Sequence, residues 1–180
     1  KTGALGDFGC FSLYATKNIM CGEGGVVTTN SDDAAAAIRS FRQHGMTSSY
    51  EYADLGYNYR MSNVIAGVVR GQYKYLDEHI AQKKAIYERY KEGLKDLPLQ
   101  MNPVDEENTN PNYWLSCILI NEEAMCKQVR SEQEYLYVSE EGKSCPHEIL
   151  DTLFKYNAEG RPIWKPMHMQ PIYRNHIFIT

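Results

Sequence analysis

An α/β fold is expected for this chain of 180 residues, and three features of the sequence favour it. Residues 9–15 and 24–29 are rich in aromatic, aliphatic and β-branched side chains without helical spacing, which is typical of short strands. Stretches with helical character follow, and an apolar segment lies at residues 113–120. The order strand, strand, helix favours an α/β architecture with an antiparallel or crossing edge.

Two helices are predicted before the middle of the chain. The first covers residues 34–43, because residues 30–33 (Asn-Ser-Asp-Asp) supply a capping side chain and acidic groups at its start. The second is predicted as one long helix from Ser62 to about Leu97, because apolar residues recur there at intervals of three and four. We expect this long helix to bridge two modules.

A domain boundary is predicted near residue 97, where Pro98 stops the long helix. Residues 1–97 then form part of a large domain, and residues 98–180 form a small α/β domain. Residues 101–112 are predicted to be a polar connector rich in proline and asparagine.

Three elements are predicted within the small domain. Residues 113–120 have the composition of a buried strand, and residues 122–143 are polar with weak periodicity, which predicts an exposed and partly helical insertion. Ser144 is predicted to cap a helix that ends near Asn157, and residues 161–166 are predicted to be extended.

The composition excludes several classes of protein. Hydrophobic residues make up 43% of the chain and charged residues 23%, as in soluble globular proteins. The net charge of −4 and the scattered basic residues argue against a nucleic-acid partner. The apolar runs are much shorter than the roughly 20 residues that span a bilayer. Five cysteines without C-x-x-C spacing favour neither disulfides nor a metal site, so we expect a cytoplasmic protein.

Lys17 is the first candidate for chemistry. It lies at the end of the first predicted strand, before the glycine-rich turn at residues 21–25. A lysine amine in a cleft can form a Schiff base with a carbonyl group, whereas an ordinary lysine at a strand end is simply a surface charge. Ser12 lies five residues earlier and has a hydroxyl available to a phosphate, and glycines let the backbone approach a ligand closely.

Three blocks of sequence carry a resemblance to a known family. They are FSLYATKNIMCGEGGVVTT around Lys17, GYNYRMSN around Asn58, and NAEGRPIWKPMHMQP near the end of the chain. Together they resemble the DegT/DnrJ/EryC1/StrS family of sugar-nucleotide aminotransferases. The resemblance implies the C-terminal part of a fold-type-I transferase that depends on pyridoxal 5′-phosphate.

The resemblance also implies roles for individual residues. Lys17 is the residue to which pyridoxal phosphate attaches and the general base, Ser12 binds the cofactor, and Asn58 reaches the cofactor phosphate of a neighbouring subunit in a homodimer. The residues alone favour a different interpretation, in which Asn58 is a turn residue or lies just before a helix cap. Arg60 is either a ligand of a substrate carboxylate or a surface residue at a helix start.

The third block narrows the expected substrate. It resembles the version found in family members that aminate C4 of a UDP-linked 4-keto-6-deoxy-HexNAc, with glutamate as the expected amino donor. Lys165 and His168 are candidates to contact the sugar or the diphosphate, although an edge strand with a satisfied histidine explains them as well. Ala158 and Gly160 depart from the bulkier residues usual in this block.

Alternative functions within the same fold are a cofactor-binding sensor or scaffold without catalysis, and a sugar dehydratase in which histidine replaces the lysine. Lys17 is present, which favours aminotransfer over both. The resemblance further implies that these 180 residues are a C-terminal fragment, because the family's aspartate for the pyridine nitrogen and its first phosphate-binding turn lie upstream. We expect such a fragment to be inactive alone.

Overall fold

The computed structural model describes residues 1–130 and 135–177. The chain forms two compact units, which are described separately. The first contains Lys1–Glu92 and Pro103–Ser116, and the second contains Gly93–Asn102 and Cys117–Thr180. The chain therefore passes from one unit to the other more than once, and the predicted division of the whole protein at residue 97 stays a prediction.

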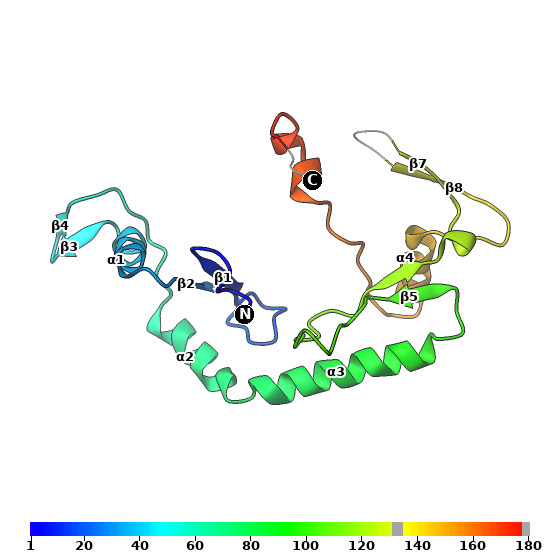
Figure 1. The fold of residues 1–180 in the computed structure, drawn as a ribbon, viewed down its shortest axis with the longest axis horizontal. Coiled ribbons are helices and arrows are strands. Elements are labelled where there is room, and N and C mark those ends of the chain that lie inside the picture. The colour runs from blue at the N-terminus through cyan, green and yellow to red at the C-terminus, as the bar shows by residue number, and fades with distance from the viewer. Residues whose placement is uncertain (131–134, 178–180) are drawn as a thin grey trace. The chain divides into compact units, whose positions relative to one another are not determined.

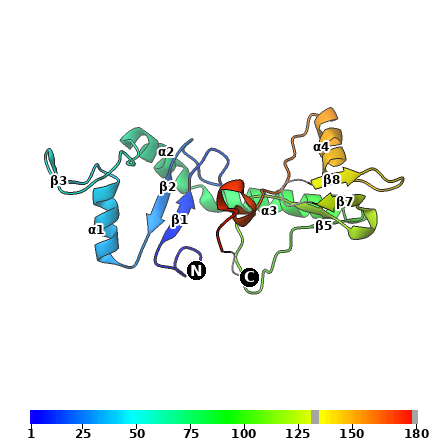
Figure 2. The same ribbon diagram turned by 90° about the horizontal axis from the view of Figure 1, so that it is seen from above.

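The first unit begins with an antiparallel hairpin. Strands β1 (Gly9–Ser12) and β2 (Gly25–Thr28) pair in a register that places Ser12 opposite Gly25 (Figures 1 and 2). Both predicted strands are confirmed, each shorter than expected. The long connection between them, residues 13–24, is called the lysine loop below because it contains Lys17.

Helix α1 (Asp32–Phe41) follows the hairpin. The Ser31 side chain caps it by accepting a hydrogen bond of 3.2 Å from the amide of Ala34, and two aspartates lie in its first turn, where they complement the helix dipole. The predicted helix and its capping segment are confirmed. The next residues form a small hairpin of β3 (Met46–Ser48) and β4 (Glu51–Tyr52).

The chain after this small hairpin lies directly on the end of α1. The amide of Tyr57 donates to the carbonyl of Phe41 at 2.7 Å, and the amide of Tyr59 donates to that of Arg42 at 3.0 Å. The approach is close enough that a Cβ atom on Gly56 would lie 2.1 Å from the backbone nitrogen of Gly45. Only glycine fits there, because any side chain would overlap backbone atoms.

Two helices occupy the region where one was predicted. Helix α2 (Asn63–Tyr73) is capped by Ser62, and helix α3 (Leu76–Gly93) begins after a turn in which the amide of Tyr75 donates to the carbonyl of Gln72 at 2.9 Å (Figure 1). The prediction of a single helix to residue 97 was therefore wrong. The apolar spacing continues across the break, but α3 starts anew with acidic residues in its first turn.

Residues 103–116 return to the first unit after a short excursion, and we call them the strap. Tyr113 is the buried residue of the strap, 8% exposed, and its ring packs on that of Tyr87 in α3 with 5.5 Å between centroids. Tyr113 has a φ of +50°, which interrupts an extended strand. The predicted strand at 113–120 was wrong for its first half, and only β6 (Ile118–Ile120) is formed.

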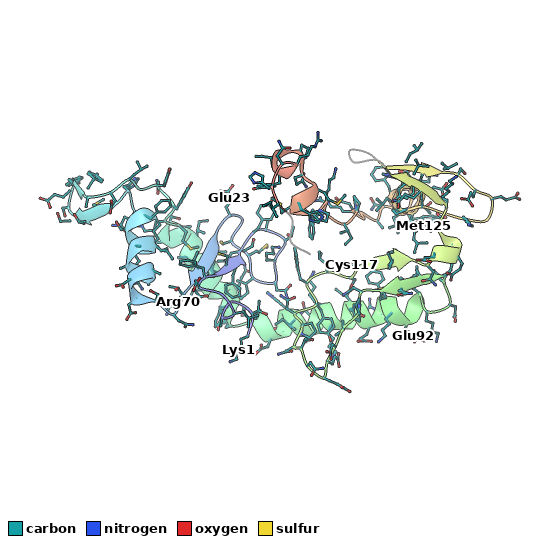
Figure 3. The ribbon with its side chains drawn as sticks, turned by 45° about the horizontal axis from the view of Figure 1, so that its top comes forward. Lys1, Glu23, Arg70, Glu92, Cys117 and Met125 are labelled. Carbon is teal, nitrogen blue, oxygen red and sulfur yellow. The ribbon has the colours of Figure 1, made fainter. Side chains whose placement is uncertain are left out.

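The second unit contains two further hairpins and a helix. Strand β5 (Leu99–Met101) pairs antiparallel with β6, which Cys117 and Met125 flank in Figure 3. The short 3₁₀ helix η1 (Glu122–Ala124) leads to the antiparallel strands β7 (Lys127–Arg130) and β8 (Tyr135–Val138). The insertion predicted to be partly helical is thus mainly a hairpin, and its residues 131–134 lie outside the described residues.

Helix α4 (Pro146–Lys155) is capped at Cys145 and not at Ser144 as predicted. The reason is that Pro146 occupies the first turn, so the Ser144 hydroxyl donates instead to the Glu148 carboxylate at 3.0 Å. Among the described residues of this unit, the buried apolar ones are Cys126 and Cys145, 4% and 6% exposed, and burial raises the pKa of the Cys126 thiol. Residues 161–166, predicted to be extended, form no regular secondary structure, and 3₁₀ helices η2 (Met167–Met169) and η3 (Pro171–Tyr173) follow them.

Gly56→Ala is predicted to lower the free energy of unfolding by about 1–3 kcal/mol, because the new methyl group would overlap the backbone at Gly45. Gly67→Ala in α2 is the matched control, since a Cβ there meets no atom within 4 Å. It is predicted to raise the free energy of unfolding by up to about 1 kcal/mol through helix propensity. Urea unfolding followed by circular dichroism measures both changes, and equal effects of the two substitutions would contradict the close packing at Gly56.

Candidate functional site

The lysine loop is a compact extension of the β1–β2 hairpin. The amide of Leu13 donates to the carbonyl of Gly24 at 3.0 Å, and the amide of Cys21 donates back to the carbonyl of Leu13 at 2.9 Å. Cys21 is buried, 7% exposed, and Gly24 has a φ of +139°, which a residue with a side chain rarely adopts. Glu23, labelled in Figure 3, belongs to the turn between them. The loop is therefore closed at its base by hydrogen bonds and by the glycine.

Two side chains and one backbone carbonyl from three other elements contact the tip of the loop. In α2, the Gln72 side-chain oxygen accepts from the amide of Met20 at 3.1 Å. In α3, His79 Nδ1 lies 2.8 Å from the carbonyl oxygen of Asn18, so this nitrogen carries the proton that bonds to it. In the strap, the carbonyl oxygen of Asn112 accepts from the Asn18 amide nitrogen at 2.8 Å.

Lys17 lies on an aromatic face. Its ammonium nitrogen is 3.1 Å from the centroid of the Trp114 ring, and Trp114 Nε1 donates to the carbonyl oxygen of Thr16 at 2.9 Å. The amide of Lys17 donates to the carbonyl of Tyr14 at 3.0 Å, and the residue is half-buried. The strap therefore contacts both the backbone before Lys17 and the amine itself.

Ser12 lies on the same hairpin, at the end of β1. Its exposed hydroxyl oxygen accepts a hydrogen bond of 3.3 Å from the amide of Tyr14. The hydroxyl proton stays available to an acceptor, which is what a phosphate oxygen requires. Ser12 and Lys17 are thus presented by one local structure.

Asn58 and Arg60 lie elsewhere in the first unit, where the chain returns along α1. Asn58 forms an isolated bridge with Gln43, and Arg60 Nη1 donates to the side-chain oxygen of Gln43 at 3.3 Å. Both residues are exposed. The aromatic rings of Tyr57 and Tyr59 stack beside them with 5.2 Å between centroids, so their backbone is held by packing as well as by hydrogen bonds.

Lys165 and His168 belong to the second unit and form a separate group. Both are exposed, and the Gln170 side chain donates to the carbonyl oxygen of Lys165 at 3.1 Å. His168 lies in η2. Their predicted roles with a substrate stay predictions.

Several residues of the site carried no signal of their own in the sequence. Their sequence context is that of ordinary helices for Gln72 and His79, a polar connector for Asn112 and a predicted strand for Trp114. Their importance comes from hydrogen bonds and ring contacts to the lysine loop, which no local pattern encodes. The only sequence feature that could have drawn attention to these residues is the asparagine-rich composition of the strap next to Trp114.

The strap is anchored to α3 by charge as well as by packing. Tyr113 OH donates to the Glu106 carboxylate, which also accepts from the Lys84 ammonium at 2.8 Å. The Lys84 hydrogen bond, followed by that of Tyr113, holds the pKa of Glu106 below its ordinary value of 4.5. The same carboxylate raises the pKa values of Lys84 and Tyr113. One acidic residue thus joins the strap to the helix.

The residues of the lysine loop suit a cofactor that carries a carbonyl group and a phosphate. Lys17 offers a primary amine without a carboxylate partner among the described residues, and Ser12 offers a hydroxyl donor. The Asn18 side-chain oxygen is buried and has no hydrogen-bond partner within the described part of the chain. A buried acceptor of this kind calls for a donor from a bound molecule or water. The donor set therefore fits pyridoxal phosphate.

Comparison with known families decides the identity of this arrangement. The model of the DegT/DnrJ/EryC1/StrS aminotransferase family matches residues 1–178. The chain belongs to this family. The aminotransferases of the family depend on pyridoxal phosphate, and neighbouring structures are known in PLP and PMP forms.

Two curated relatives illustrate the range of the family. GDP-perosamine synthase of Caulobacter vibrioides is 30% identical over 177 residues, which cover 96% of this chain and 43% of the relative. The dTDP-3-amino-3,4,6-trideoxy-alpha-D-glucose transaminase of Micromonospora megalomicea is 38% identical over 97 residues, covering 53% of this chain and 26% of the relative. The chain thus spans less than half the length of these proteins.

Solved structures show the same fold. PseC of Helicobacter pylori, an aminotransferase involved in the biosynthesis of pseudoaminic acid, matches 98% of this chain and 44% of its own with a TM-score of 0.77 at 21% identity. DesV of S. venezuelae matches 95% of this chain and 41% of its own with a TM-score of 0.69 at 26% identity. The expected α/β fold of fold-type-I aminotransferases is confirmed.

The described residues contain neither a cluster of metal ligands nor a helix that could span a membrane. No group of three or more histidine, cysteine, aspartate or glutamate side chains is arranged there to hold a metal ion. Nor does any helix in the described ranges combine the length and the apolar content needed to cross a membrane.

Glu106→Gln is predicted to remove a pH-dependent part of the stability. Because the folded pKa of Glu106 is lowered, its contribution is present above its ordinary value of 4.5 and is lost as the pH falls through the folded pKa. The wild type is therefore predicted to be more stable than the variant near neutral pH, and the difference is predicted to shrink below pH 4.5.

Urea unfolding of both proteins at a series of pH values measures this difference. Asp105→Asn is a useful control, since the pKa of Asp105 is lowered by hydrogen bonds from Asn108 and does not depend on Lys84. A difference between wild type and Glu106→Gln that is constant across the acidic range would show that Glu106 does not anchor the strap through its charge.

Proposed function

We propose that this chain is part of a pyridoxal-phosphate-dependent aminotransferase that converts a nucleotide-linked 4-keto-6-deoxy sugar to an amino sugar, with glutamate as the amino donor. The product serves the biosynthesis of amino sugars and surface polysaccharides, and the enzyme works in the cytoplasm. The observation that carries the proposal is the Lys17 amine, held in a tethered loop and free of any carboxylate among the described residues.

The relatives support the class of substrate. The names of the two curated relatives refer to a GDP-linked and a dTDP-linked amino sugar, so related chains act on nucleotide sugars. These relatives differ in the nucleotide and in the sugar. The choice of a UDP-linked 4-keto sugar for this chain depends on the segment NAEGRPIWKPMHMQP at residues 157–171.

Three candidate site residues of the first unit are given a role with the cofactor. Pyridoxal phosphate, when bound, supplies the electron sink that makes transfer of an amino group possible. Lys17 would hold it covalently, and the Lys17 amine would serve as the general base that moves the proton. The Ser12 hydroxyl would donate a hydrogen bond to the phosphate, and the Asn58 side chain would reach the phosphate of a neighbouring subunit in a homodimer.

The remaining candidate residues are assigned to the substrates. Arg60 can bind the carboxylate of the amino donor through two parallel hydrogen bonds, although Gln43 holds one of its nitrogens in this structure. Lys165 and His168 are exposed and polar, as contacts to a sugar diphosphate require. In the proposal, contacts from Lys165 and His168 to the diphosphate or the sugar make the enzyme prefer a sugar nucleotide over other carbonyl compounds.

Lys17→Ala is predicted to abolish the covalent attachment of pyridoxal phosphate, because no other amine occupies the tethered loop. Borohydride reduction followed by intact-protein mass measures the attachment. The matched control is Lys74→Ala, another lysine on an aromatic face, 4.7 Å from the Tyr75 ring centroid at the end of α2. Undiminished attachment in Lys17→Ala would show that Lys17 is not the cofactor lysine.

The whole protein is predicted to produce an amino sugar and 2-oxoglutarate from a UDP-linked 4-keto-6-deoxy-HexNAc and glutamate. GDP-linked and dTDP-linked keto sugars tested in parallel measure the preference for the nucleotide. Attachment of pyridoxal phosphate at Lys17 without turnover of any keto sugar would favour the alternative of a cofactor-binding sensor or scaffold.

A further inference from the structure

We infer that Trp114 is the positioning residue for Lys17. Its indole holds the ammonium group and the backbone of the lysine loop at the same time. The inference deepens the proposed function, since it concerns the same lysine, but it depends on contacts within the first unit and not on a bound cofactor.

The contact between the two side chains is close. The Lys17 ammonium lies 3.1 Å from the ring centroid, whereas cation–π attraction extends to about 6 Å. Tryptophan is the aromatic side chain that attracts cations most strongly. Lys17 is half-buried, so solvent screens the contact only in part. Within the described part of the chain, the Lys17 ammonium makes its cation–π contact with this indole.

A second contact fixes the direction of the ring. Trp114 Nε1 donates to the carbonyl oxygen of Thr16 at 2.9 Å, one residue before Lys17. Rotation of the indole away from the loop would break this hydrogen bond and the cation–π contact together. The amine and the backbone that bears it are therefore held by one rigid group.

Trp114 has supports that do not involve Lys17. Its amide donates to the Asn112 side-chain oxygen at 3.2 Å, and the carbonyl of Asn112 in turn accepts from Asn18. The neighbouring Tyr113 is buried against Tyr87 in α3. The position of the indole is thus fixed by contacts of the strap that do not involve Lys17.

The choice of an aromatic partner has a chemical consequence. A carboxylate would hold the ammonium through a full opposite charge and would accept its protons in hydrogen bonds. An indole face attracts the cation, but it loses this attraction once the amine gives up its proton. The neutral amine is the form that attacks a carbonyl carbon. The contact with Trp114 therefore attracts the ammonium form of Lys17 and does not restrain the neutral amine in the same way.

Acetylation with N-hydroxysuccinimide acetate tests this contact without any cofactor. The rate of labelling at each lysine is measured by peptide mass, with Lys74 as the internal reference. Trp114→Leu is predicted to raise the labelling rate of Lys17 relative to Lys74 by about two- to fivefold, the range that the energy of an exposed cation–π contact corresponds to.

Two further variants separate the contact from general loosening. Trp114→Phe keeps an aromatic face and is predicted to retain most of the protection of Lys17, although it lacks the hydrogen bond to Thr16. Trp164→Leu replaces the other tryptophan of the chain, which lies in the second unit, and is predicted to change nothing at Lys17.

Two outcomes would overturn the inference. The first is an unchanged labelling ratio at Lys17 in Trp114→Leu. The second is an equal rise at Lys17 and at Lys84, which would mean that the whole strap has come away from α3. If the wild type binds no pyridoxal phosphate at Lys17, the proposed function fails while the acetylation result still decides the role of Trp114.

Discussion

The first unit depends on how the polar backbone of the lysine loop is satisfied. Twelve residues separate β1 from β2, and the backbone hydrogen bonds within the loop extend from its base to the amides of Ala15 and Lys17. Backbone groups near the tip need partners, because unpaired polar groups away from water are costly. Gln72, His79 and Asn112 supply contacts to the loop. Two helices and the strap are therefore tied to the same few residues.

Elements with local determinants could be predicted from the sequence. The β1–β2 hairpin and α1 follow from β-branched residues, glycines and the capping Ser31. The break between α2 and α3 could not be predicted from the sequence, because the spacing of apolar residues continues through it. The positive φ of Tyr113, which shortens the expected strand, occurs where its ring packs on Tyr87 and its hydroxyl donates to Glu106.

The candidate site also has some residues that the sequence predicts and others that it does not. Lys17 and Ser12 lie in one contiguous motif, so the sequence alone is enough to propose them as site residues. The groups that hold the motif lie far along the chain: His79 is 61 residues from Asn18, Asn112 is 94 residues from it, and Trp114 is 98 residues from Thr16. Contacts at such separations arise from tertiary packing, which local periodicity does not encode.

The path of the chain between the two units has a consequence for dissection of the protein. The strap belongs to the first unit although it follows the excursion of residues 93–102 into the second. A polypeptide that ends at residue 97, where the long helix was expected to stop, would retain Lys17 and Ser12 but lose Asn112 and Trp114. Limited proteolysis in the excursion could leave the strap attached through its side chains, whereas a truncated gene product would never contain it.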